Sequence, residues 1–148
     1  MRFFYFSSVP IEAIRLGGMT MDDPRLQDSN WFEAKFKDWT RQYKANILEE
    51  IARDGQLNPN LALWNGENWR IEPGQARWMA LYKLGIPNQK VIAIFNEDEE
   101  KHFELLKQYQ HEEITTRAEL EKCFLSTKWE DHHGLGFFRR KYSQYFQE

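Results

Sequence analysis

The stretch from Leu61 to Phe95 constrains the fold most, because it predicts three strands and a helix within thirty-five residues. "LALW" and "NWRI" are short strand-forming runs separated by Asn65-Gly66, a strong hairpin signal because both residues tolerate a positive φ. A helix follows from about Gln75 to Leu84 and stops at Gly85. The apolar run "VIAIF" (91–95) predicts a buried strand. The order indicates an α+β (α/β-like) fold with a small mixed sheet and packed helices.

The flanking segments add helices around this unit. Phe32, Phe36, Trp39 and Tyr43 recur at helical spacing, and residues 31–54 form one helix or two before Gly55 ends them. "RFFYF" near the N-terminus predicts another strand. Helical patterns after residue 97 predict a C-terminal helical extension. We expect a single domain over 1–148, with a core at 1–96 and an extension at 97–148.

Composition excludes several classes of protein. A net charge of −3 argues against a protein that coats nucleic acid by bulk charge, although a local basic patch is compatible with it. The single cysteine, Cys123, excludes an internal disulfide and a cysteine-based zinc cage, and its apolar surroundings favour an inert core thiol. No stretch approaches the roughly 18 to 20 apolar residues of a membrane span. A cytoplasmic protein without a membrane partner is expected.

The sequence "EPGQAR" (72–77) supplies the residue types of a phosphate site at a helix start. A helix N-terminus offers unpaired N–H groups and partial positive charge, and Gly74 lets an anion approach the backbone. The amides of Gln75 and Ala76 and the guanidinium of Arg77 complete the candidate site, with Glu72 as the candidate catalytic acid. The alternative is a plain strand-to-helix turn.

The C-terminal quarter holds two further candidates. "EDHHG" (130–134) is either a polar loop or a contributor to the site, and its adjacent histidines do not predict a metal centre. "FFRRKYSQYF" (137–146) interleaves aromatic residues with Arg139, Arg140 and Lys141. This pattern suits contact with nucleic acid or a protein partner, and equally an amphipathic tail with its rings packed inward.

The element order resembles the ParB/sulfiredoxin-like superfamily, which includes ParB-like nucleases, over roughly residues 9–95. The matching positions are Gly55, Leu57, Pro59, the strands 61–64 and 68–71, Gly74, Arg77, Ala80, Leu84, Gly85 and 91–95. This resemblance implies a ParB/sulfiredoxin-like fold and phosphate or nucleotide handling at Gly74–Arg77. Sulfiredoxins carry a reactive cysteine after the glycine, where this chain has Gln75, so their chemistry is excluded.

Two functions from different classes follow. In the first, the chain binds a nucleotide or nucleic-acid phosphate in DNA-related biology, as a nuclease or nucleotide hydrolase if it is catalytic. Mg²⁺ is expected only with a nucleoside triphosphate. In the second, the chain is a non-catalytic accessory or inhibitory protein that binds a protein partner or DNA through its aromatic-basic tail. The oligomeric state does not follow from the sequence.

Overall fold

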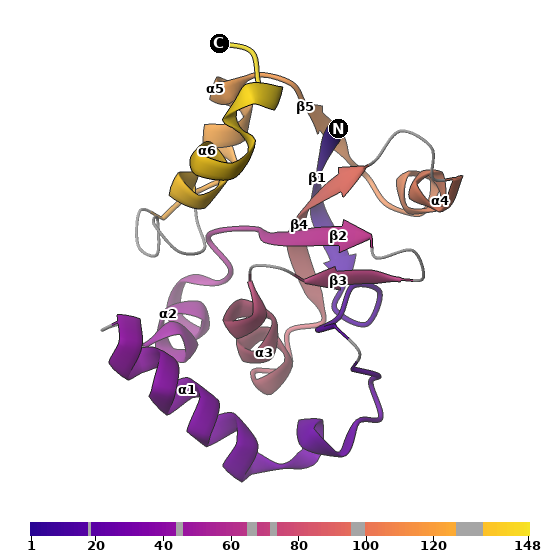
Figure 1. The fold of residues 1–148 in the computed structure, drawn as a ribbon. Helices are drawn as coiled ribbons and strands as arrows, with labels where there is room; N and C mark the ends of the chain where they lie inside the picture. Colours follow the sequence, from indigo (N-terminus) through magenta and orange to yellow (C-terminus); the bar gives the residue numbers. More distant parts are fainter. Residues whose placement is uncertain (18, 44–45, 65–67, 72–73, 96–99, 127–134) are drawn as a thin grey trace.

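The computed structural model describes residues 1–148 except 18, 44–45, 65–67, 72–73, 96–99 and 127–134. Its strands and helices are mixed along the chain (Figure 1). In order they are β1 (Arg2–Pro10), η1 (Pro24–Gln27), α1 (Ser29–Tyr43), α2 (Ile47–Asp54), β2 (Asn60–Trp64), β3 (Trp69–Ile71), α3 (Gln75–Lys83), β4 (Asn88–Phe95), α4 (Glu100–Gln108), β5 (Glu112–Ile114), α5 (Arg117–Lys122), α6 (Leu135–Tyr142) and η2 (Ser143–Tyr145).

The five strands form one mixed sheet in the order β3-β2-β4-β1-β5. β2 and β4 are parallel, and the other three neighbouring pairs are antiparallel. A parallel pair needs a crossover, which β3 and α3 provide between β2 and β4. The expected α+β fold with a small mixed sheet is confirmed.

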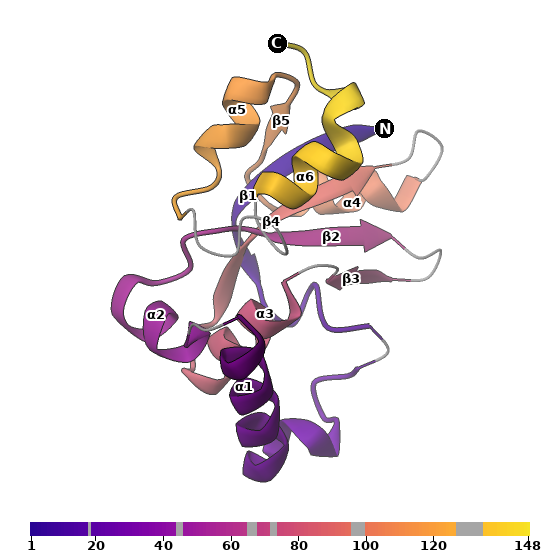
Figure 2. The same cartoon turned by 60° about the vertical axis from the view of Figure 1, so that its left-hand side comes forward.

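Each face of the sheet has its own hydrophobic core, because alternate residues of a strand project to opposite faces. Phe4, Phe6, Ala62 and Ala93 belong to the core that α1, α2 and α3 cover. On the opposite face, the residues next to them in sequence pack with α5 and α6, and these are Phe3, Leu61, Ile92 and Ile94. Figure 2 shows the two groups of helices on either side of the strands. The C-terminal extension therefore completes the sheet's second core.

The helical segment before the hairpin consists of two helices, which answers the question left open by the sequence. The second of them, α2, begins after Asn46, whose side chain accepts a hydrogen bond from the Glu49 amide at 3.1 Å and so caps the helix. Gly55, at φ 75°, ends α2 as expected. The β2–β3 pairing matches the expected hairpin, while its turn, Asn65-Gly66, lies outside the described residues.

Candidate functional site

The N-terminus of α3 lies where the sequence places the candidate phosphate site. The first helical hydrogen bond joins the Trp78 amide to the Gly74 carbonyl at 2.9 Å. The amides of Gln75, Ala76 and Arg77 therefore precede the helical ladder, where an α-helix has no acceptor for them. Gln75 is exposed and Ala76 half-buried. Of the described residues at the start of α3, Gln75 is thus the one exposed to solvent, beside the buried Gly74.

Gly74 is required here by close packing against Asn60. It adopts φ 117°, and a Cβ at this position would lie 2.4 Å from Oδ1 of Asn60. Asn60 is fully buried at the start of β2, and its Nδ2 donates to Oε1 of Gln89 at 2.9 Å. Its Oδ1 has no hydrogen-bond partner within the described part of the chain. Only a glycine allows the strand-to-helix connection to pass this close to Asn60.

Arg77 lies in the core rather than at the surface. It is 4% exposed, and its Nη1 donates to the Pro59 carbonyl at 2.9 Å. Burial lowers the pKa of the Arg77 guanidinium to about 10, and the nearby Glu50 carboxylate opposes that shift. The side chain stays protonated at neutral pH. It borders a hollow of about 10 Å³, room for no more than a water molecule.

The candidate site thus consists of an exposed residue at the start of α3, Gln75, and a buried guanidinium, that of Arg77. The structure brings Gly74, Gln75, Ala76 and Arg77 together within the first turn of α3, as sequence adjacency requires. It directs the Arg77 side chain inward, toward Pro59 and Glu50. The candidate acid, Glu72, lies outside the described residues.

Two arginines that the sequence did not indicate lie together at β3. Arg15 and Arg70 form an isolated parallel β-bridge, and the Ile71 amide donates to the Arg15 carbonyl at 2.9 Å. Both residues are half-buried. Trp69 and Ile71, on either side of Arg70, belong to the core that α3 covers, so Arg70 and the Arg15 paired with it project from the opposite face of the sheet. β3 ends at Ile71, just before the chain reaches Gly74. The two arginines lie far apart in the sequence and share no motif, so only the fold reveals the pair.

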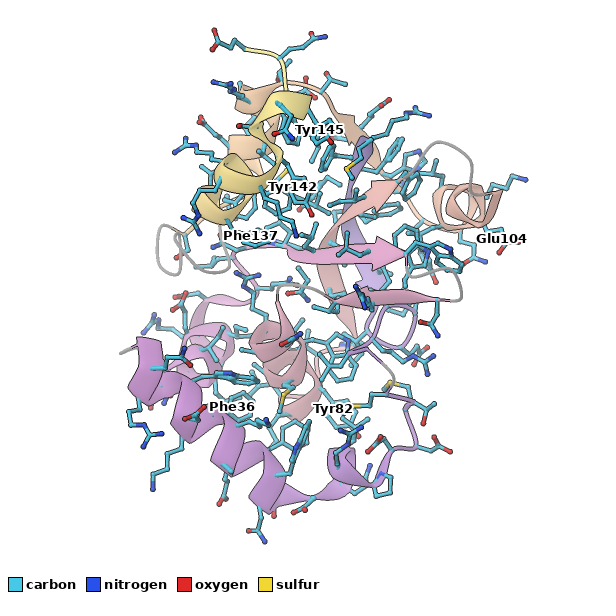
Figure 3. The ribbon with its side chains drawn as sticks, viewed as in Figure 1. Phe36, Tyr82, Glu104, Phe137, Tyr142 and Tyr145 are labelled. Atoms are coloured by element: carbon cyan, nitrogen blue, oxygen red, sulfur yellow. The ribbon has the colours of Figure 1, made fainter. Side chains whose placement is uncertain are left out.

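The basic residues of the tail are solvent-exposed, but most of its rings are not. Arg139, Arg140 and Lys141 project from α6 into solvent, and Arg139 forms an ion pair with Glu121 of α5. Phe138, Tyr142 and Phe146 are buried in the second core, and Tyr145 is 41% exposed. Figure 3 labels Phe137, Tyr142 and Tyr145 in this region. The inward-packed alternative, which included Tyr145, is therefore correct for Phe138, Tyr142 and Phe146 and wrong for Tyr145.

The remaining sequence candidates give less. His132 and His133 lie outside the described residues. Among the residues that are described, no group of three or more His, Cys, Asp or Glu side chains could hold a metal ion. In the same part of the chain, none of the helices has the length and apolar character needed to cross a membrane.

Comparisons with known proteins yield similarity in structure only. No family model matches the chain, and no curated protein sequence does. Sulfiredoxin from Arabidopsis thaliana is 16% identical, with a TM-score of 0.39 over 68% of this chain and 96% of that one. C-terminally truncated ParB from Caulobacter crescentus, a chromosome-partitioning protein complexed with CTP-γ-S, is 18% identical, with a TM-score of 0.38 over 62% of this chain and 44% of that one.

Both similarities concern the fold alone and assign no ligand or reaction to this chain. The two proteins found are a sulfiredoxin and a ParB, which are the two names in the resemblance drawn from the sequence. The fold of this chain is α+β, a mixed five-stranded sheet packed with helices, and a C-terminal helix is present.

Proposed function

We propose that this chain binds a phosphate group of a nucleotide or nucleic acid at the N-terminus of α3. The observation that supports this most is the exposure of Gln75 at the first position of the helix, preceded by a glycine in the left-handed region. Amides at a helix N-terminus point toward an approaching anion, and the helix dipole adds partial positive charge.

Arg77 is the cation that belongs to this site, because it lies in the first turn of α3. Arg77 contributes positive charge from behind the amides, since its guanidinium is buried and donates to Pro59. In this proposal Arg77 positions the loop and attracts the anion, while the amides of Gln75 and Ala76 contact it.

If the bound phosphate ester is also hydrolysed, an acid and a metal ion are needed beside the binding site. Glu72 would be the acid of a nuclease or nucleotide hydrolase, and Mg²⁺ would arrive with a nucleoside triphosphate and balance its charge. Binding does not depend on either, so binding is tested first.

A thermal-shift panel tests the binding site directly. The four common nucleoside triphosphates with magnesium, inorganic phosphate and a short single-stranded DNA are each added to the full chain. A ligand at a hundredfold excess over its Kd raises the free energy of unfolding by about 2.7 kcal/mol. We expect Gln75→Glu to weaken that ligand about tenfold, because a carboxylate then stands at the start of α3.

The matched control is Gln42→Glu, the same change at an exposed position of α1. It should leave the ligand's Kd unchanged. Arg77→Ala is unsuitable as the primary variant, because removing a buried, hydrogen-bonded cation disturbs folding itself. If no ligand raises the melting temperature, or if Gln75→Glu and Gln42→Glu behave alike, the proposed site is wrong.

A further inference from the structure

A hollow of about 210 Å³ lies between α5 and α6, on the opposite side of the sheet from α3. Its floor is apolar, and its rim carries charged and polar groups. The lining residues are Arg117, Leu120, Glu121, Leu135, Arg139, Ser143 and Phe146. Leu120 and Phe146 are buried in the second core, so the floor is part of the folded structure. The hollow is thus a built feature of the C-terminal extension.

The arginines on the rim form solvent-exposed ion pairs with glutamates. Arg117 pairs with Glu148 at 3.2 Å, and the side chains are 50% and 87% exposed. Arg139 pairs with Glu121, and those side chains are 53% and 49% exposed. Ion pairs this exposed contribute little to stability, about 0 to 1 kcal/mol. A carboxylate from another molecule could therefore replace either glutamate at small cost.

The size of the hollow favours one large side chain over a free small molecule. Pockets for small ligands usually measure about 300–1,000 Å³, and this hollow falls below that range. Protein interfaces commonly depend on a single aromatic or aliphatic anchor that fills a pocket, surrounded by polar contacts. An apolar floor under two arginines has that form.

The surrounding charge favours an acidic partner. α5, α6 and the final residue carry five basic side chains (Arg117, Lys122, Arg139, Arg140, Lys141) against three acidic ones (Glu119, Glu121, Glu148), whereas the whole chain carries −3. Nucleic acid is also acidic, but stacking of single-stranded bases requires exposed rings. Of the rings in α6 and the residues after it, Phe138, Tyr142 and Phe146 are instead buried, Phe137 is half-buried and Tyr145 alone is exposed, which leaves no row of exposed rings.

We propose that this hollow is the docking site for an acidic segment of a protein partner. A large apolar side chain of that segment fills the space above Leu120 and Phe146. Carboxylates on either side of it pair with Arg117 and Arg139. The surface is separate from the start of α3, so this inference stands or falls independently of the phosphate site.

Titration of the ¹⁵N-labelled full chain with defined peptides tests it. The probe is an amidated Glu-Glu-Phe-Glu-Glu peptide, compared with versions that carry Gly for Phe or Lys for Glu, and with a short single-stranded DNA. We expect the acidic Phe peptide to shift the amide signals of Leu120, Leu135 and Ser143 saturably. The Gly peptide should bind about tenfold more weakly, because the anchor is lost.

Two neighbouring residues of α6 supply the matched variants. Arg139 lines the hollow, whereas Arg140 is exposed and does not. Arg139→Glu should weaken the acidic Phe peptide about tenfold, and Arg140→Glu should change its Kd about twofold at most. Ser143→Leu, which fills the hollow from its rim, should block binding while the spectrum stays dispersed.

Several results would overturn the docking site. They are no saturable shift with the acidic Phe peptide, equal binding of the Gly or Lys peptide, and equal losses in Arg139→Glu and Arg140→Glu. A DNA titration that moves the same signals with equal affinity would replace the proposed protein partner with nucleic acid.

Discussion

At the scale of single residues, Gly74 is a position where the fold does not tolerate a side chain. Its φ of 117° disfavours every residue with a Cβ, and Asn60 occupies the space that the Cβ would need. A residue in this region costs about 1–3 kcal/mol in backbone strain alone. The contact with Asn60 adds to that cost, since hydrogen bonding to Gln89 holds the amide in place.

Gly74→Ala should therefore lower the free energy of unfolding by at least about 3 kcal/mol, measured by urea denaturation. Gly85→Ala is the control, because Gly85 has φ 72° but nothing within 4 Å of an added Cβ. It should cost only about 1 kcal/mol. Asn60→Ala combined with Gly74→Ala should recover part of the loss. Equal costs at both glycines would contradict the role given to Asn60.

Cys123 illustrates how surroundings decide the reactivity of a thiol. Burial raises its pKa from 9.0 to about 11, and the carboxylates of Glu112 and Glu119 contribute in the same direction. Its Sγ lies 3.4 Å from the Glu119 carbonyl oxygen. The thiol is therefore protonated at neutral pH, as the sequence suggested for an inert core cysteine.

Alkylation by iodoacetamide at pH 8 should be about a hundredfold slower in the native chain than in urea, because the thiolate fraction falls with the two-unit rise in pKa. Because the thiol has the lower pKa in the unfolded state, that state loses the proton first as the pH rises. Stability should thus decline as pH rises from about 9 toward 11. Equal alkylation rates in both states would show that the thiol is solvated like a free cysteine.

At the scale of elements, α6 joins the core through one face and leaves its charges in solvent. Phe138 is 1% exposed and lies against Phe124, with ring centroids 5.5 Å apart. The adjacent Phe137 is half-buried, and Lys141 lies over its ring. The two neighbouring phenylalanines therefore have different structural roles.

Phe138→Ala should lower the free energy of unfolding by about 3–5 kcal/mol, because it leaves a cavity in the second core. Phe137→Ala should cost about 1 kcal/mol, since water already reaches that ring. Thermal or urea melts of the two variants measure the difference. If both variants melt like the unchanged chain, α6 is an appendage and the second core does not depend on it.

The loop between α2 and β2 is held by side-chain amides that imitate strand pairing. Gln56 both donates to the Lys90 carbonyl at 2.9 Å and accepts from the Lys90 amide at 2.7 Å. Asn58 does the same with Ser126, at 3.1 and 3.0 Å. These hydrogen bonds connect the loop before β2 to β4 and to the C-terminal extension. The sequence did not predict these hydrogen bonds, because a single buried Asn or Gln produces no periodic pattern.

At the scale of the whole molecule, local signals predicted the elements well and the long-range contacts poorly. The strand–helix order, the ends at Gly55 and Gly85 and the inward face of the tail all follow from turn chemistry and periodicity. β5 was missed, since three residues of a Glu-Glu-Ile strand carry almost no pattern. β5 forms by antiparallel pairing with the edge of β1 that β4 leaves unpaired.

The candidate site was predictable in position but not in orientation. The glycine before Gln75 placed the start of α3 correctly, because a helix start is a property of neighbours in the chain. The inward direction of Arg77 depends on Pro59 and Glu50, and the Arg15–Arg70 pair depends on the packing of β3. Contacts between distant segments decide both, so the sequence alone could not supply them.

The position of β1 in the sheet has a consequence for how the chain folds during synthesis. β1 lies between β4 and β5, and its Arg2 pairs with Phe95, which the ribosome adds ninety-three residues later. Until β4 emerges, the aromatic run of the first strand has no partner on either edge. Pairing across so long a separation is slow, and an unpaired apolar strand is prone to aggregate. β1 therefore stays exposed to aggregation until the partner strands that follow it have been synthesised.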